Sequence, residues 1–360
     1  MYSIGMSQYL KGRGALSNPP NRFSATKVAD VDDGWSLQEV PDSIATHVRP
    51  ERARTIITTN QSPDIPFEQS INPYRGCEHG CPYCYARPSH AYMDLSPGLD
   101  FETHLFYKAD AAELLRAELG KKGYVCKPIT VGANTDPYQP LEKRLKVTRS
   151  ILEVLRDTRH PVTIITKGSL ITRDLDLLAE LARDGLVNVF VTVTTLENQT
   201  KRLLEPRAAA PAARLRIIRQ LTECGVRVGV LVAPVIPAIT EHELEQVLAA
   251  AAQAGAKQAG YVILRLPHEL KILFREWLEE HYPGRAAHVM SIIHSMRGGQ
   301  DNDPRFGSRM RGEGPFAQLL RQRFQLACAR YGLARGAAPA LSTALFRPPP
   351  ANAGQLDMGF

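Results

Sequence analysis

The stretch PVTIITKGSLITRDLDLLAELARDGLVNVFVTVTTL, residues 161–196, predicts a strand, a helix and a second strand in succession. Residues 161–167 form a short apolar run, and the leucines of 172–185 recur at helical spacing before Gly185, a residue that favours the left-handed turn after a helix. The β-branched run 186–196 is typical of a parallel strand that is covered on both faces. Two strands joined by a helix pair in parallel, so this stretch predicts a parallel sheet.

The same β-then-α unit recurs on both sides of this stretch. We expect strands at 69–76, 127–134, 161–167, 186–196, 226–237 and 258–267, and helices at 110–122, 146–158, 172–185, 210–225, 240–255 and 268–281. Thr240 and Glu243 have the spacing of a capping box. Six units predict an α/β fold, and both a partial barrel and a doubly wound sheet fit that count. In either case the active groups gather at the carboxyl ends of the strands.

The flanking regions have a different composition. Residues 1–65 are interrupted by Pro, Gly and Asp and predict an extended lead-in, while 66–282 hold the six units. We expect 283–334 to contain an arginine- and glycine-rich loop followed by a closing helix, and the Ala/Pro-rich tail 335–360 to be disordered.

Composition narrows the class of protein. The 360 residues are 44% hydrophobic and 22% charged, with no apolar run as long as a membrane span and no apolar leader near residue 1, so we expect a cytoplasmic protein without a membrane partner. Thiols stay reduced there, so the six cysteines favour metal binding or catalysis over disulfides. The net charge of +7 permits a polyanionic partner without requiring one.

Three cysteines lie within eight positions: Cys77, Cys81 and Cys84, in NPYRGCEHGCPYCYARPSH (72–90). A structural zinc site uses four ligands, which His79 or His90 would have to complete. A cubane iron–sulfur cluster held by three thiolates keeps one iron for a ligand from outside the protein. An open coordination position of this kind suits a metal site that binds substrate.

The spacing C-x3-C-x2-C, with the aromatic Tyr83 before the last cysteine, resembles the radical S-adenosylmethionine (SAM) enzymes. INPYRGCEHGCPYCYARPSH, TDPYQPLE and PVIPAIT are similar to the spore photoproduct lyase-like branch, and SPDIPFEQSINPYRGCEHGC and DNDPRFGSRMRGEGPFA are similar to an uncharacterised bacterial subgroup of it. The resemblance implies a partial (β/α)6 barrel with an N-terminal extension and a C-terminal helical segment. It also implies a [4Fe–4S] cluster, SAM, reductive formation of a 5′-deoxyadenosyl radical that abstracts hydrogen, and an electron donor such as flavodoxin or ferredoxin.

The resemblance places SAM across the strand ends, with Tyr83 along the adenine ring. Thr135 and Asp136 stand where the family has a Gly-Gly-Glu triplet that accepts bonds from the SAM amino group, and this chain lacks the triplet. Alternatively, Asp136 bonds its own backbone in a turn before Pro137.

The other implied SAM contacts lie further along the chain. Lys167 ends the third expected strand and Arg207 follows the fourth, and either cation suits the SAM carboxylate. Thr194, Thr195 and Asn198 close the fourth strand and are candidates for the ribose hydroxyls. The alternatives are a solvated lysine and ordinary strand threonines.

Spore photoproduct lyase uses a cysteine at the carboxyl end of its second strand as hydrogen donor, and residues 132–135 hold none. Cys126 lies at the start of that strand, and Cys224 and Cys328 fit small core residues. Tyr138 is the candidate for a substitute catalytic donor, with a packing tyrosine as the alternative. Reversal of a thymine dimer by the lyase's own mechanism is therefore not expected.

The arginines of SMRGGQDNDPRFGSRMRGEG (295–314) suit phosphates or another anion over the barrel mouth, or else form a solvated surface loop. The resemblance suggests a DNA or RNA base as the substrate. The positive net charge and these arginines agree with that suggestion. The alternative function is a non-catalytic, zinc- or iron–sulfur-stabilised nucleic-acid-binding module.

Overall fold

The computed structural model describes residues 12–24, 44–336 and 340–350. Its main sheet has the strand order β11-β10-β9-β8-β7-β6-β3-β2, in which every pair is parallel except β2 and β3. The six central strands are β3 (Gln69–Ile71), β6 (Ile129–Val131), β7 (Val162–Thr166), β8 (Val187–Thr192), β9 (Arg227–Val235) and β10 (Gln258–Ile263). The edge strands are β2 (Thr58–Thr59) and β11 (Ala334–Arg335).

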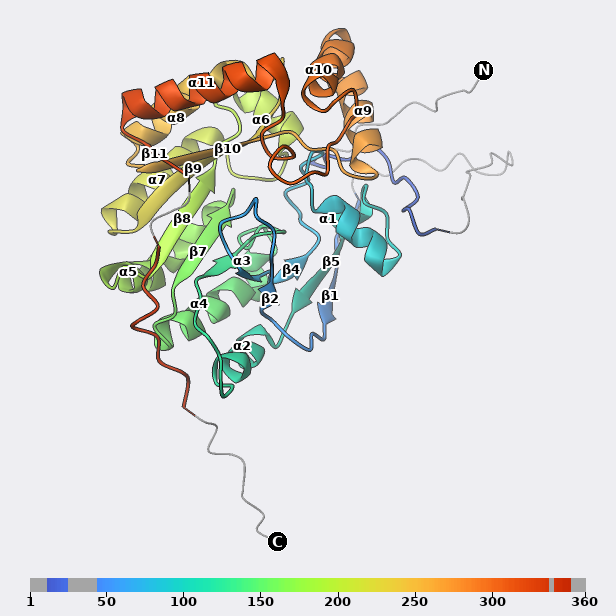
Figure 1. The fold of residues 1–360 in the computed structure, drawn as a ribbon. Helices are drawn as coiled ribbons and strands as arrows, with labels where there is room; N and C mark the ends of the chain where they lie inside the picture. Colours follow the sequence, from blue (N-terminus) through green and yellow to red (C-terminus); the bar gives the residue numbers. More distant parts are fainter. Residues whose placement is uncertain (1–11, 25–43, 337–339, 351–360) are drawn as a thin grey trace.

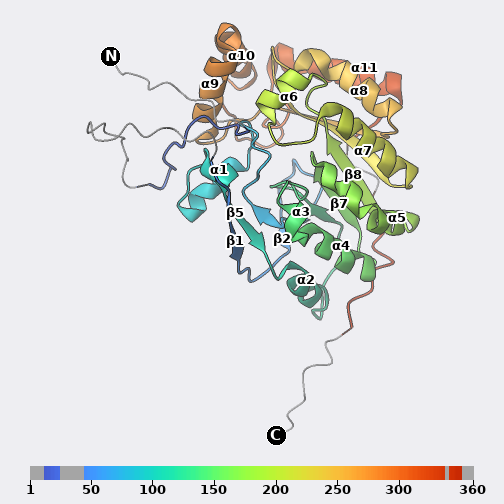
Figure 2. The same cartoon turned by 180° about the vertical axis from the view of Figure 1, so that it is seen from behind.

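The order of the strands decides between the two architectures that the sequence left open. The six central strands lie side by side in chain order, so the sheet never reverses direction and its helices collect on one face. Figure 1 shows this curved sheet, and Figure 2 shows the helices that cover its outer face. These helices are α2 (Ala111–Leu119), α4 (Val147–Asp157), α5 (Leu175–Arg183), α7 (Pro211–Glu223) and α8 (Leu244–Gln253), with α11 (Gly314–Tyr331) packed on α8.

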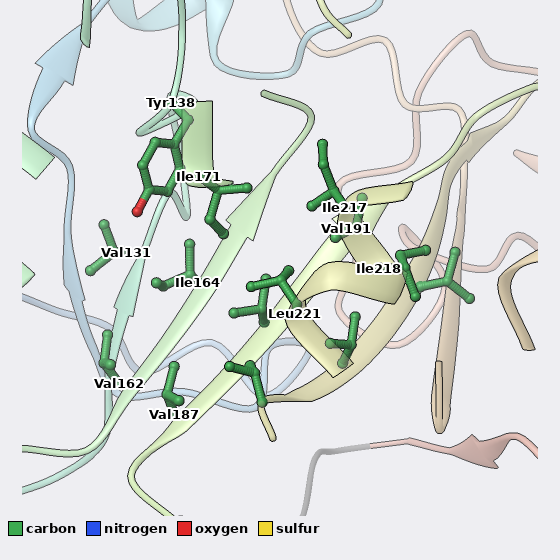
Figure 3. Close-up of a cluster of buried hydrophobic side chains, with 14 of the residues drawn as sticks. Val131, Tyr138, Val162, Ile164, Ile171, Val187, Val191, Ile217, Ile218 and Leu221 are labelled. Atoms are coloured by element: carbon green, nitrogen blue, oxygen red, sulfur yellow. The ribbon is translucent and has the colours of Figure 1, made fainter. Parts of the chain in front are cut away.

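Alternation along the strands explains how one sheet has two different faces. Val162 and Ile164 of β7 point toward the helices, where they lie near Val187 and Val191 of β8 and Leu221 of α7 (Figure 3). Each fully buried aliphatic side chain of this kind stabilises the fold by about 1.5–3 kcal/mol. The strand expected to be covered by helices on both faces, β8, packs on helices with one face only, because a singly wound sheet leaves its inner face free to line a cavity.

A second, three-stranded sheet packs beside the barrel in the order β1-β5-β4. Its strands are β1 (His47–Glu51), β4 (Tyr74–Arg75) and β5 (His104–Lys108). The remaining elements are α1 (Asp100–Thr103), α3 (Glu142–Leu145), α6 (Asn198–Leu204), α9 (Leu270–His281), α10 (Pro283–Met296) and the 3₁₀ turns η1 (Arg87–Met93), η2 (Ser169–Asp174) and η3 (Glu241–Glu243). α9 and α10 lie together beyond β10 (Figure 1). No helix among the described residues is long and apolar enough to cross a membrane.

The proposed capping box at residue 240 does not form. The Thr240 hydroxyl accepts a hydrogen bond from the Ile236 N–H at 2.9 Å, and the Glu243 carboxylate accepts from the Leu196 N–H at 2.7 Å. The two side chains are recruited by neighbouring segments, which the local spacing does not reveal.

The expected division of the chain at residues 65, 282 and 334 stays a prediction. Part of the expected lead-in lies outside the described residues, as do 337–339 and 351–360 of the expected disordered tail. Residues 340–350 of that tail are described, and the Phe346 ring packs edge-on against His160 with ring centroids 5.2 Å apart.

Candidate functional site

The inner face of the sheet and the loops beyond its carboxyl ends enclose a cavity of about 1160 Å³. All three motif cysteines line it. So do the inward-facing residues of the strands, among them Thr163 and Ile165 of β7 and Asn188 and Phe190 of β8, which alternate with the outward-facing core residues. The cavity exceeds the roughly 300–1,000 Å³ that a typical small-molecule site occupies.

Cys77 and Cys81 are buried, Cys84 is half-buried, and all three thiols are free. Burial, and then Glu205, raise the pKa of Cys81 to about 12, with Lys167 acting in the opposite direction. Three free thiols that share one cavity fit an iron–sulfur cluster with one iron left for an outside ligand. Within the described ranges, no three His, Cys, Asp or Glu side chains are grouped as the ligands of one metal ion would be. The two histidines considered as a fourth ligand are engaged elsewhere, His79 with Asp136 and His90 with the His104 carbonyl.

The cysteine loop is held by a buried ion pair between Arg87 and Glu102, both fully shielded from solvent. Arg87 also donates to the Cys81 carbonyl at 2.7 Å, and Glu102 accepts from the Ala15 N–H at 2.9 Å. The chain near residue 14 therefore lies directly on the loop. A Cβ at Gly14 would stand 1.6 Å from the Gly80 carbonyl oxygen, so only glycine allows this approach.

Asp136 lines the cavity, but its oxygens are already occupied. Oδ1 accepts from the Tyr138 N–H at 2.9 Å and the Thr166 hydroxyl at 2.7 Å, and Oδ2 accepts from the Lys167 N–H at 2.7 Å. His79 Nδ1 lies 3.4 Å from Oδ2. A carboxylate has about four acceptor positions, so little remains for a SAM amino group. The turn proposed as the alternative role of Asp136 is present, because its carboxylate accepts a hydrogen bond from the backbone two residues further on.

Lys167 has a different environment. It lies just beyond β7 in the cavity wall, and among the described residues no carboxylate is within 4.0 Å of its ammonium group. Burial would lower its pKa, but Cys81, Glu205 and Asp136 outweigh burial and raise it. Lys167 therefore stays charged in the cavity and is available to an anion.

A buried carboxylate, Glu205, organises the wall beside the cysteines. It accepts hydrogen bonds from the Tyr83 and Thr194 hydroxyls and forms an ion pair with Arg214, whose side chain is 2% exposed. Burial alone would raise the pKa of Glu205, but Arg214 and Lys167 lower it to about 2. Tyr83 lines the cavity with its hydroxyl fixed, whereas Thr194 serves Glu205 and is not part of the lining.

The structure places the other predicted SAM contacts outside the cavity lining. The Thr195 hydroxyl donates to Glu243, Asn198 is exposed at the start of α6, and Arg207 pairs with Glu78 at 3.0 Å. Thr135 does line the cavity, with its hydroxyl donating to the Tyr74 carbonyl at 2.7 Å.

Tyr138 requires a correction. Its ring is 1% exposed and lies with Val131, Ile164 and Ile171 on the helix-covered face of the sheet (Figure 3). A hydrogen donor must face the reacting group, so the packing role fits Tyr138 and the donor role does not. Among the described residues, Cys126, Cys224 and Cys328 also lie outside the cavity lining.

Sequence reasoning missed Arg265 and Asp64, which lie in the loops after β10 and β2 and line the cavity. Arg309, one of the arginines expected over the barrel mouth, lines it as well. Arg309 forms an ion pair with Asp64 and donates to the Ser62 hydroxyl at 2.5 Å, which joins the loop between α10 and α11 to the loop after β2. Arg265 was expected inside a strand, but β10 ends at Ile263 and leaves it beyond the carboxyl end.

Comparison with known proteins agrees with this fold. The family model "Radical SAM superfamily" matches residues 71–251. An uncharacterized protein of Mycobacterium tuberculosis is 34% identical over 278 residues, covering 77% of this chain and 78% of its own length. An uncharacterized protein of Methanocaldococcus jannaschii is 28% identical over 173 residues, covering 48% and 62%.

Solved structures of spore photoproduct lyase share the fold. The complex with dinucleoside spore photoproduct has a TM-score of 0.58 at 14% identity, covering 80% of this chain and 81% of that one. A variant with bound AdoMet and the same dinucleoside has a TM-score of 0.58 at 16% identity, covering 80% of both chains. At this identity the likeness concerns the fold alone.

The fold and the cysteine-lined cavity define an α/β protein with a parallel sheet of the radical SAM type. The chain belongs to the radical SAM superfamily. The predicted family and fold are thereby confirmed.

Proposed function

We propose that this radical SAM enzyme binds a [4Fe–4S] cluster through Cys77, Cys81 and Cys84 and binds SAM beside it. The single observation that carries the proposal is that three free thiols share one cavity with Lys167, a cation with no carboxylate within 4.0 Å among the described residues. The cluster and SAM, when bound, supply a 5′-deoxyadenosyl radical that abstracts hydrogen from a substrate. A DNA or RNA base is the substrate class we favour, since spore photoproduct lyase, which shares the fold, forms a complex with a dinucleoside spore photoproduct.

The chain's own residues would then position the cofactor and exclude water. Lys167 would hold the SAM carboxylate, because it is half-buried in the cavity wall and no carboxylate lies within 4.0 Å of its ammonium group among the described residues. Tyr83 offers a flat face whose orientation is fixed by its bond to Glu205. Asp136 orients this wall through the Lys167 N–H and the Thr166 hydroxyl. Thr194, Thr195, Asn198 and Arg207 are not retained as SAM contacts.

The test is anaerobic reconstitution followed by incubation with SAM and a strong reductant, with 5′-deoxyadenosine as the measured product. We expect product from the native protein and none from Cys81→Ala, which also should lose absorbance near 400 nm. Cys126→Ala is the matched control, since this thiol lies outside the cavity lining and its loss should leave both signals unchanged. A colourless native protein that binds stoichiometric zinc in place of iron would overturn the proposal.

A further inference from the structure

Arg265 is a cation in the cavity wall without an adequate partner. It lies two residues beyond β10, and the hydrogen bond of its guanidinium among the described residues goes to the Met310 sulfur at 3.5 Å. A thioether is a weak acceptor. The Arg265 Nε is buried and has no hydrogen-bond partner. A buried donor group in this state favours an acceptor supplied from outside the chain.

Neighbouring arginines show what a structural role looks like in the same region. Arg297 is 3% exposed and donates to the carbonyls of Leu264, Ser308 and Arg309 at 2.8–3.0 Å. Arg309 is neutralised by Asp64. Arg265 donates to no carbonyl and has no carboxylate within 4.0 Å among the described residues. Burial and then Arg309 lower its pKa, and Tyr85 and Asp64 offset them only in part.

Arg311 adds a second guanidinium to the same wall. It is exposed, lines the cavity and has no carboxylate within 4.0 Å among the described residues. Two guanidinium groups on one wall present more donors than one carboxylate can accept. A phosphate group has enough oxygens to accept from both forks.

The position of this wall relates it to the cysteines. Tyr85 directly follows Cys84 and lines the cavity. Arg265 lines the same cavity as Tyr85 and the three cysteines. A ligand held by Arg265 therefore occupies the cavity that the cluster region also lines. The cavity of about 1160 Å³ leaves room for a second molecule beside SAM.

We propose that Arg265 and Arg311 form a subsite for a phosphate group of the substrate, separate from Lys167 and the cysteines. The subsite rests on the proposed function for its role in catalysis, but not for its ability to bind. The flat ring of Phe190 and the amide groups of Asn72 and Asn188 on the same cavity surface suit the remainder of a nucleotide. The phosphate belongs either to a free nucleotide or to the backbone of a nucleic-acid strand.

The test is equilibrium dialysis of the anaerobic, cluster-loaded protein with SAM present. The probes are the four deoxynucleoside 5′-monophosphates as an equimolar mixture, the four unphosphorylated nucleosides, and a mixed-sequence six-nucleotide single strand of DNA. We expect a phosphate-bearing probe to bind at least about tenfold more tightly than the nucleosides, and Arg265→Gln to remove most of that difference. Arg311→Gln should act in the same direction, and Arg265→Lys should retain part of the binding. Arg219→Gln, on the exposed face of α7, is the matched control.

The outcomes separate the subsite from the proposed function. Tight binding of the monophosphates identifies a free nucleotide, and binding of the strand alone identifies a nucleic-acid backbone; both support the subsite. Equal binding of nucleosides and phosphate-bearing probes overturns it, as does equal behaviour of Arg265→Gln and Arg219→Gln. Absorbance near 400 nm and SAM binding, measured on the same samples, report on the proposed function. If the native protein shows neither the absorbance nor SAM binding, the proposed function is contradicted. If it shows both but binds no phosphate-bearing probe more tightly than the nucleosides, only the subsite is contradicted.

Discussion

The two ends of the barrel differ in how their polar groups are satisfied. At the amino end, His160 Nδ1 lies 3.0 Å from the Pro161 carbonyl, and its Nε2 lies 2.8 Å from the Tyr124 hydroxyl, under the ring of Phe346. At the carboxyl end, Lys167 and Arg265 lack carboxylate partners among the described residues. Buried groups that are fully paired stabilise a fold, whereas unpaired ones mark where a ligand completes the structure. The predictions below test this contrast.

The largest effect should come from a buried and fully paired part of the carboxyl end, the ion pair of Glu205 with Arg214. Glu205→Gln leaves Arg214 buried without its counter-charge, so we expect a loss of about 3–5 kcal/mol in the free energy of unfolding, measured by urea titration. Glu245→Gln is the control: its pair with Arg323 is partly exposed, and its loss should cost at most about 1 kcal/mol. Equal effects of the two substitutions would contradict the structural role of Glu205.

At the amino end, His160 should make stability depend on pH. Burial lowers the pKa of His160 to about 4, so the unfolded chain binds a proton before the folded chain does as the pH falls. The contribution of His160 is fully present above about pH 6.5 and is lost as the pH falls toward about 4, with a total of about 3 kcal/mol. His160→Gln should reduce the slope of the unfolding free energy across this window, leaving the share of His90, whose pKa burial also lowers to about 4, and the exposed His288→Gln should not change it. If the pH dependence of the unfolding free energy is unchanged in His160→Gln, His160 is not held in its neutral form in the folded protein.

Lys167 tests the unpaired part of the carboxyl end. Lys167→Gln removes the cation proposed for the SAM carboxylate, and we expect SAM affinity to fall about tenfold to a hundredfold, measured by equilibrium binding to the cluster-loaded protein. Absorbance near 400 nm should stay unchanged. The exposed Lys257→Gln serves as control. Unaltered SAM affinity in Lys167→Gln would show that Lys167 does not bind the SAM carboxylate.

The smallest effect is expected at Phe346, which covers the amino end. Phe346 is half-buried against Tyr124 and His160, so Phe346→Ala should lower the free energy of unfolding by about 1–2 kcal/mol. SAM binding should not change, since Phe346 lies at the opposite end of the barrel from the cysteines. A large loss of SAM affinity would show that the two ends are coupled.

Prediction from the sequence succeeded where the signal is local. The periodicity of each β-then-α unit located the six central strands and their helices, and the spacing of Cys77, Cys81 and Cys84 identified the family. Lys167 and Tyr83 were found because each has a fixed place relative to a strand end or a cysteine, and both line the cavity. Their roles toward SAM stay predictions.

The failures share one physical cause, which is competition from partners distant in sequence. Thr194 and Thr195 were read as free hydroxyls, but Glu205 and Glu243 take them. Tyr138 follows a strand end as an active residue would, yet its ring turns to the helix-covered face (Figure 3). Neither the partner of a hydroxyl nor the direction of a ring is encoded in spacing along one segment.

By itself, the sequence determined the class of protein, the number of β/α units and the three cysteines, because hydrophobic period and motif spacing are properties of neighbouring residues. Only the tertiary structure decided which polar groups are paired and which remain for a ligand. Asp136 and Lys167 are equally polar in the sequence, and packing fills the acceptor positions of the first while placing no carboxylate within 4.0 Å of the ammonium group of the second among the described residues. Arg265 gained its place in the cavity in the same way, from the end of β10 and the loop that follows α10.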